Sequence, residues 1–106
     1  MSLQECINQW HVVENLKLAA LRSWQIPDST SPSDLQNSLA LSQRLLSECW
    51  TSEPILREER KLTSSLAQLS PEDFKRWKLT EFELHQTSLQ TQTEILQPKI
   101  IEKFLQ

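Results

Sequence analysis

The sequence predicts an all-α protein, an antiparallel bundle of about four helices with a short helical tail at its C-terminus. Apolar residues recur at steps of three and four along most of the 106 residues, and no run keeps the period of two that a strand requires. Glycine is absent, which argues against glycine-dependent hairpin turns. Serine–proline pairs divide the chain into segments of helical length, because serine caps a helix and proline suits its first turn. A chain of this length forms one domain at most, which we assign to residues 1–106.

The first predicted helix spans residues 2–25. Ser2 and Glu5 have the spacing of a capping box, in which each side chain satisfies a backbone N–H of the first turn. The apolar residues behind this start share one face: Leu3, Cys6, Ile7, Trp10, Val13, Leu16, Ala20, Leu21 and Trp24. Pro27 and the polar residues after it then predict a loop over 26–31.

Two further helices are predicted over residues 32–51 and 53–69. In the second helix we expect Ser31 to cap the start and Pro32 to occupy the first turn. The pair Ser70-Pro71 has the same pattern at the start of the last helix. Pro54 either begins a third helix or kinks one long helix. A proline in a helix interior costs about 3 kcal/mol, so we expect a break near Thr51.

The longest predicted helix spans residues 71–97, and we expect the earlier segments to pack against it. Ser70 caps its start, and acidic residues in its first turn complement the helix dipole. Its middle, residues 86–93, is mostly polar, so we expect loose packing or a projection beyond the bundle. Pro98 should kink or end the helix and leave residues 98–105 as a tail. So short a segment is not a stable helix alone, so it must dock on the bundle or on a partner.

Composition excludes several classes of function. A net charge of −3 argues against a nucleic acid or an anionic membrane as the partner. Without glycine the chain has no glycine-rich phosphate loop. No apolar run approaches the roughly 20 residues of a membrane span, and the N-terminus lacks the pattern of a signal peptide. Cys6 and Cys49 are far apart in sequence and are expected to be reduced core thiols of a cytoplasmic protein.

We expect no catalytic site, no metal and no cofactor. His11 with Glu14, and Glu81 with His85, each share a helical face and offer an imidazole and a carboxylate. Neither pair has the Glu-x-x-His order of metal sites in helical bundles. Cys49 has no histidine near it in the sequence, and the serines cluster at caps and loops, where bonding to the backbone explains them.

The tryptophans and the tail are the candidate partner-binding residues. Tryptophan is among the residues that contribute most to protein interfaces, and four tryptophans are many for the interior of so small a bundle. Trp24 and Trp50 fall at predicted helix ends and are expected to be partly exposed. The tail adds four apolar residues at helical spacing: Ile100, Ile101, Phe104 and Leu105.

Residues 39–62 carry a pattern that resembles the FliT family of flagellar export chaperones. The stretch Leu39-Ala40-Leu41-Ser42-Gln43-Arg44-Leu45-Leu46 is followed by Trp50 and then by Ile55-Leu56-Arg57-Glu58-Glu59-Arg60-Lys61-Leu62. In this resemblance Leu45, Leu46, Trp50 and Leu56 match packing residues of the family, and Glu59 matches a helix acid. It covers about a third of the chain, and residues 2–25 have no counterpart in it. The resemblance implies a bundle whose C-terminal helix covers a hydrophobic groove for secretion substrates or regulators.

These observations predict a non-enzymatic, cytoplasmic protein-binding module, a small chaperone or adaptor that receives an amphipathic segment of a partner protein in an apolar groove. In this hypothesis the tail after Pro98 occupies the groove until a partner displaces it. One alternative is a structural subunit whose tryptophan-bearing faces form a homodimer or a permanent complex. A metal-binding helical bundle is the third hypothesis.

Overall fold

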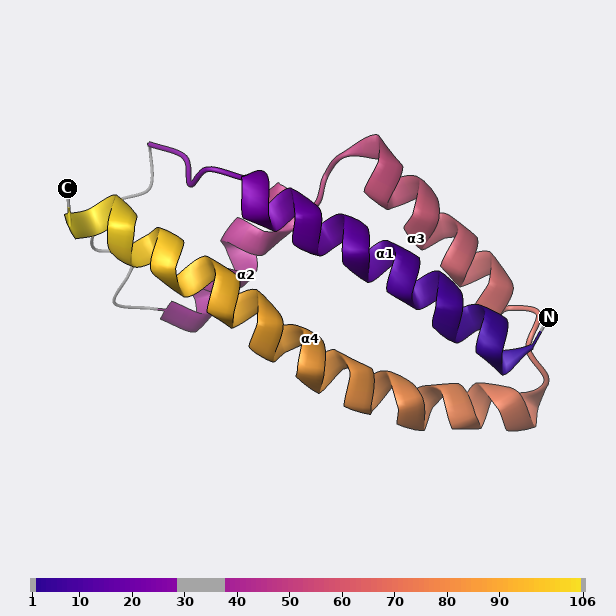
Figure 1. Cartoon of the computed structure of the whole chain (residues 1–106). Coiled ribbons are helices and arrows are strands. Elements are labelled where there is room, and N and C mark those ends of the chain that lie inside the picture. The colour runs from indigo at the N-terminus through magenta and orange to yellow at the C-terminus, as the bar shows by residue number, and fades with distance from the viewer. Residues whose placement is uncertain (1, 29–37, 106) are drawn as a thin grey trace.

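The computed structural model describes residues 2–28 and 38–105, with side chains described for 2–28 and 44–103. These residues form four helices and no strand (Figure 1): α1 (Leu3–Ser23), α2 (Ser38–Cys49), α3 (Glu53–Leu66) and α4 (Pro71–Leu105). The all-α prediction is therefore confirmed for this part of the chain, and the antiparallel order of the helices stays a prediction.

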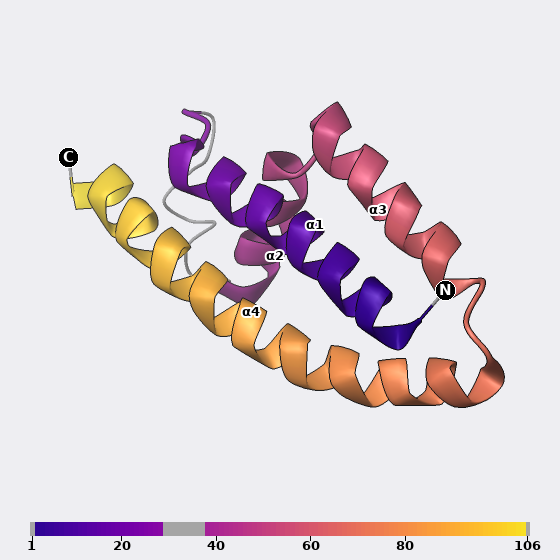
Figure 2. The ribbon, with the colours of Figure 1, turned by 45° about the vertical axis from the view of Figure 1, so that its right-hand side comes forward.

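The helix against which the others pack is α1. Helices α2, α3 and α4 each contact it, and α1 lies between α3 and α4 in both views (Figures 1 and 2). This corrects the expectation that the longest helix, α4, organises the fold. The physical reason is that α1 buries residues along its whole length, from Cys6 through Val13 to Leu21, and so can support a neighbour on more than one face.

Local chemistry at the helix starts agrees with the sequence. Ser2 Oγ accepts a hydrogen bond of 3.2 Å from the Glu5 backbone N–H, and Ser70 Oγ accepts one of 3.2 Å from the Asp73 N–H. The break between the second and third helices is confirmed, since α2 ends at Cys49 and α3 begins at Glu53. Helices α1 and α3 end two or three residues before the positions predicted for them. The expected start of the second helix, at residues 31–32, lies outside the described residues.

The expected boundary at Pro98 is wrong, because α4 runs without interruption from Pro71 to Leu105. A proline removes the N–H that would bond the carbonyl of the residue four positions earlier, here Glu94. Glu94 and Pro98 are both exposed, and residues four apart share a helix face. The carbonyl that loses its partner is therefore on the side of α4 that water reaches. Packing of Leu96 and Ile100 on either side of Pro98 holds the helix in place.

Two buried clusters of the core lie where α2 meets the second halves of α1 and α4. Leu21 of α1, Cys49 of α2 and Leu96 of α4 form one buried cluster, and a second joins Ile26 with Leu45. The molecule extends over 51 × 25 × 16 Å, and its shortest dimension is close to that of two packed helices. So thin a body encloses few side chains, which leaves apolar surface exposed elsewhere.

Candidate functional site

Trp50, one of the predicted partner-binding residues, is half-buried in contacts within the chain. Its indole Nε1–H donates a 3.0 Å hydrogen bond to the backbone carbonyl of Lys17. The Lys17 ammonium lies 4.8 Å from the centroid of the Trp50 ring and 2.9 Å from a carboxylate oxygen of Glu59. Trp50 therefore connects the end of α2 to α1 and, through Lys17, to α3.

Trp24 is also half-buried, and it packs against both core clusters. It follows α1 directly, in extended backbone conformation. The partial exposure that the sequence predicts for Trp24 and Trp50 is thus observed, while their contact with a partner stays a prediction. Both indoles already have a role inside the molecule.

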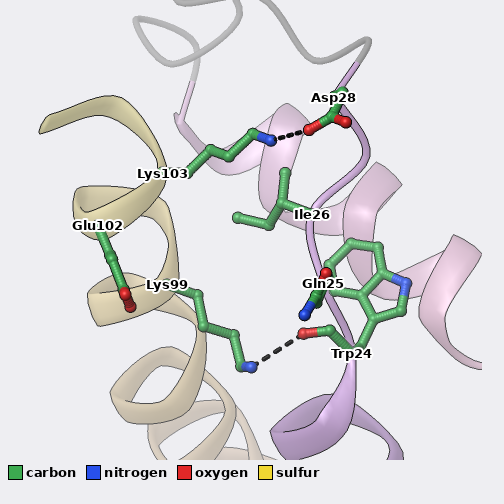
Figure 3. A pocket seen from close by; sticks show the side chains of 7 residues that line it. All are labelled: Trp24, Gln25, Ile26, Asp28, Lys99, Glu102 and Lys103. Atoms are coloured by element: carbon green, nitrogen blue, oxygen red, sulfur yellow. Dashed lines mark hydrogen bonds and ion pairs between the residues drawn. The ribbon is translucent and has the colours of Figure 1, made fainter. Parts of the chain in front are cut away.

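The last turns of α4 are fastened to the segment that follows α1 (Figure 3). Lys99 Nζ donates hydrogen bonds to the backbone carbonyls of Arg22, at 2.8 Å, and Trp24, at 2.9 Å. Carbonyls at a helix C-terminus have no partner within the helix, so Lys99 acts as a cap for α1. Lys103 forms an ion pair with Asp28, and the hydrogen bond and charge of Lys103 lower the pKa of the Asp28 carboxyl.

The four predicted tail residues do not form one free segment. Ile100 is half-buried and packs against both core clusters, whereas Ile101 is 51% exposed. The side chains of Phe104 and Leu105 lie outside the described residues. Because Ile100 is part of the core, residues 98–105 cannot leave without exposing it. Displacement of residues 98–105 by a partner thus stays a prediction, and it would require Ile100 to leave both core clusters.

An open pocket of about 340 Å³ lies between the segment after α1 and the end of α4. The residues that line it are Trp24, Gln25, Ile26, Asp28, Lys99, Glu102 and Lys103 (Figure 3). Its two ammonium groups are already bonded to backbone carbonyls and to Asp28. Lys99 and Lys103 thus join α4 to the end of α1 and the segment after it.

A polar layer joins α1 to the middle of α4. Ser88 and Gln92 are buried: Gln92 Nε2 donates a 2.7 Å hydrogen bond to Ser88 Oγ, and the Ser88 hydroxyl donates to a Glu14 carboxylate oxygen. This corrects the expectation that the polar stretch 86–93 packs loosely or projects from the bundle. The physical reason is that Glu14, distant in sequence, lies opposite Ser88 and accepts its hydrogen bond.

The two histidine–glutamate pairs considered as metal ligands are His11 with Glu14 and Glu81 with His85. Glu14 belongs to the polar layer, while His11 is exposed and its ring lies 5.2 Å from the Trp10 ring, edge to face. Glu81 and His85 are both exposed. Within residues 2–28 and 38–105, no three histidine, cysteine, aspartate or glutamate side chains gather closely enough to hold a metal ion.

Both cysteines are free and buried, as expected for reduced core thiols. Burial raises the pKa of the Cys6 thiol, with a smaller contribution from Glu5, and burial also raises the pKa of Cys49. The thiolate is the reactive form of cysteine. Burial therefore favours the protonated thiol over the reactive thiolate at both positions.

Several large apolar residues on the first half of α4 are exposed and do not take part in the core. We call them the α4 stripe: Phe74, Leu79, Phe82 and Leu89. Leu79 is 74% exposed and Phe82 is 65% exposed. Large exposed apolar patches are typical of interaction surfaces.

The α4 stripe continues into the core. Phe82, Leu89 and Leu96 follow one another at intervals of seven residues, close to two helical turns, and so share a side of α4. Leu96 is buried against Cys49 of α2. Helix α2 lies beside the second half of α4 and not beside the first (Figures 1 and 2). One apolar surface is thus covered by α2 at one end and uncovered at the other.

Comparison with known proteins gives no relative: no family model, no curated protein and no solved structure matches this chain. Of the helices in the described ranges, none is both long enough and apolar enough to cross a bilayer.

Proposed function

We propose that this chain is a non-enzymatic protein-binding module, a small chaperone or adaptor, which receives an amphipathic helix of a partner protein along the α4 stripe. The observation that supports the proposal is the exposure of Phe82 and Leu79 on a surface whose continuation, at Leu96, is buried under α2. A partner helix would extend over the first half of α4 the cover that α2 provides on the second. Laying an apolar helix face onto an apolar surface is a common mode of peptide recognition.

The expected affinity is modest. Burying one large apolar side chain completely gives about 1.5–3 kcal/mol, and the four residues of the α4 stripe are only partly exposed before binding. Association also costs several kcal/mol in lost freedom of motion. We therefore expect a dissociation constant in the micromolar range, which corresponds to about −8 kcal/mol.

This proposal differs from a mechanism in which the tail vacates a groove. The end of α4 stays in place, held by Ile100 and Lys99, and the binding surface is open before the partner arrives. The resemblance of residues 39–62 to flagellar export chaperones suggests a secretion substrate or a regulator as the partner. The free thiols of Cys6 and Cys49 support the cytoplasmic location that we propose.

The test uses a fluorescein-labelled synthetic helix with leucines at i, i+3, i+4 and i+7 and glutamines on its other faces. We expect it to bind the wild-type chain, measured by fluorescence anisotropy, and to bind Phe82→Glu more than about tenfold more weakly, a difference of about 1.4 kcal/mol. The new carboxylate would have to be desolvated against leucine. Circular dichroism should show that Phe82→Glu is folded, because Phe82 is largely exposed.

The matched control is Ile101→Glu. It introduces the same charge at another exposed apolar position of α4, outside the α4 stripe, and should leave the affinity unchanged. An equal loss of affinity in Phe82→Glu and Ile101→Glu would mean that a negative charge anywhere on α4 weakens peptide binding. No binding to the wild-type chain would contradict the proposal.

The alternative of a structural homo-oligomer predicts that the α4 stripe is covered by a second copy. Sedimentation velocity at micromolar concentration distinguishes the two. We expect a monomer for the wild-type chain. A dimer that Phe82→Glu dissociates would show that the surface serves self-association instead.

A further inference from the structure

In the first half of α4, the ionisable residues on the same side as the α4 stripe are basic: two lysines and one histidine. At about 100° per residue, Phe74 and Leu79 mark the two edges of the stripe, and Phe82 and Leu89 fall between them. Lys75, Lys78 and His85 fall within the same arc and are exposed. The acids of this half of α4 fall outside the arc: Glu72, Asp73, Glu81 and Glu83.

Lys75 and Lys78 have no anionic partner among the described residues. Neither forms an ion pair with any other described residue. Lys78 Nζ lies 5.4 Å from the centroid of the Phe74 ring, so its stem and charge border the apolar surface. Lys75 has no charged or aromatic contact within the part of the chain that the structure describes.

The other cationic side chains of α4, Arg76, Lys99 and Lys103, each contact a carboxylate or a backbone carbonyl. Arg76 lies 3.5 Å from Asp73, one turn earlier on α4. Lys99 bonds two carbonyls at the end of α1, and Lys103 pairs with Asp28. Among the described residues, the lysines of α4 without an ion pair or a carbonyl contact therefore lie beside its exposed apolar residues.

We infer that the partner helix is acidic, with glutamate or aspartate side chains beside its own apolar stripe. The inference depends on the proposed function and specifies the chemistry of the partner. The apolar contact supplies the affinity, while complementary charge within it sets orientation, specificity and association rate. An acidic helix offers carboxylates to Lys75 and Lys78, whereas a basic helix places like charges beside them.

The same charges argue against a second copy of this chain as the occupant. Two α4 stripes that face each other bring lysines and apolar residues together, and no carboxylate lies within either arc. The protein carries a net charge of −3, so an acidic partner is weakly repelled by the whole molecule and attracted at this site. Screening over about 8 Å at physiological salt leaves the local attraction dominant.

The experiment compares three labelled peptides with identical leucines, flanked by glutamate, glutamine or lysine. We expect the glutamate peptide to bind most tightly and the lysine peptide most weakly, with dissociation constants that differ by about tenfold at low salt. The difference should shrink as salt screens the charges. In Lys75→Glu/Lys78→Glu the order should reverse.

The control for net charge is Arg22→Glu/Arg57→Glu. It changes the charge of the molecule by the same amount at exposed positions of α1 and α3 and should keep the original order. If it reverses the order as well, net charge and not the stripe selects the peptide, and the inference is overturned.

The outcomes separate this inference from the proposed function. Equal binding of all three peptides, lost in Phe82→Glu, would support the docking surface and overturn the acidic partner. Tightest binding of the lysine peptide would do the same. Absence of binding for all three would overturn both.

Discussion

Replacing Leu21 by alanine is expected to lower the free energy of unfolding by about 3–5 kcal/mol. Leu21 is fully buried and belongs to the cluster in which α1 meets Cys49 of α2 and Leu96 of α4. Removing the end of its side chain leaves a cavity where three helices meet. A molecule this thin has few neighbouring side chains that could move to fill the cavity. Urea denaturation followed by far-ultraviolet circular dichroism measures the loss. It is a large fraction of the 5–15 kcal/mol that stabilises a typical domain.

The matched control for this prediction is Leu79→Ala. It makes the same chemical change on α4 at a residue that is 74% exposed, and such surface changes stay within about 0.5 kcal/mol. Similar losses at the two positions would show that α1 is not the helix on which the fold depends.

Replacing Ile100 by alanine is expected to cost about 2 kcal/mol, whereas Ile101→Ala should cost less than about 0.5 kcal/mol. The two residues are adjacent and identical, but Ile100 packs against both core clusters and Ile101 is 51% exposed. The same denaturation experiment measures both.

This pair of variants tests whether the end of α4 belongs to the core. A displaceable tail would make both substitutions harmless to stability. A large loss at Ile101 together with a small one at Ile100 would mean that α4 is rotated relative to the described packing.

The sequence predicted best those features that depend on local chemistry. The caps at Ser2 and Ser70 need only a hydroxyl and the backbone N–H groups that follow it, so they could be read from neighbouring residues. The break between α2 and α3 could also be predicted locally, because proline suits the first turn of a helix and not its interior.

Features that depend on tertiary packing could not be read in the same way. The effect of Pro98 depends on which side of α4 faces water and on the packing of Leu96 and Ile100 around it. The polar layer required a partner for Ser88 from α1, distant in sequence. Sequence periodicity shows that a helix has an apolar side, but not how many neighbours cover it.

The candidate site shows the same limit. Spacing places Phe74, Trp77, Phe82 and Leu89 near one side of a helix. The fold buries Trp77 and leaves the other three exposed. The continuation of the α4 stripe at Leu96 is covered because Leu21 of α1 and Cys49 of α2 pack there. The tryptophans suggested a partner surface because of their residue type, whereas Trp50 is engaged by the Lys17 carbonyl.

Docking of a partner helix on the first half of α4 can be located residue by residue in an NMR titration. Labelled protein is titrated with the glutamine-flanked amphipathic peptide, and the backbone amide shifts are mapped onto the helices. We predict that the largest shifts fall within residues 74–89 and that those of α3, residues 53–66, stay near their starting values. Shifts concentrated on α3, or in the pocket between residues 24–28 and 99–103, would show that the peptide docks elsewhere.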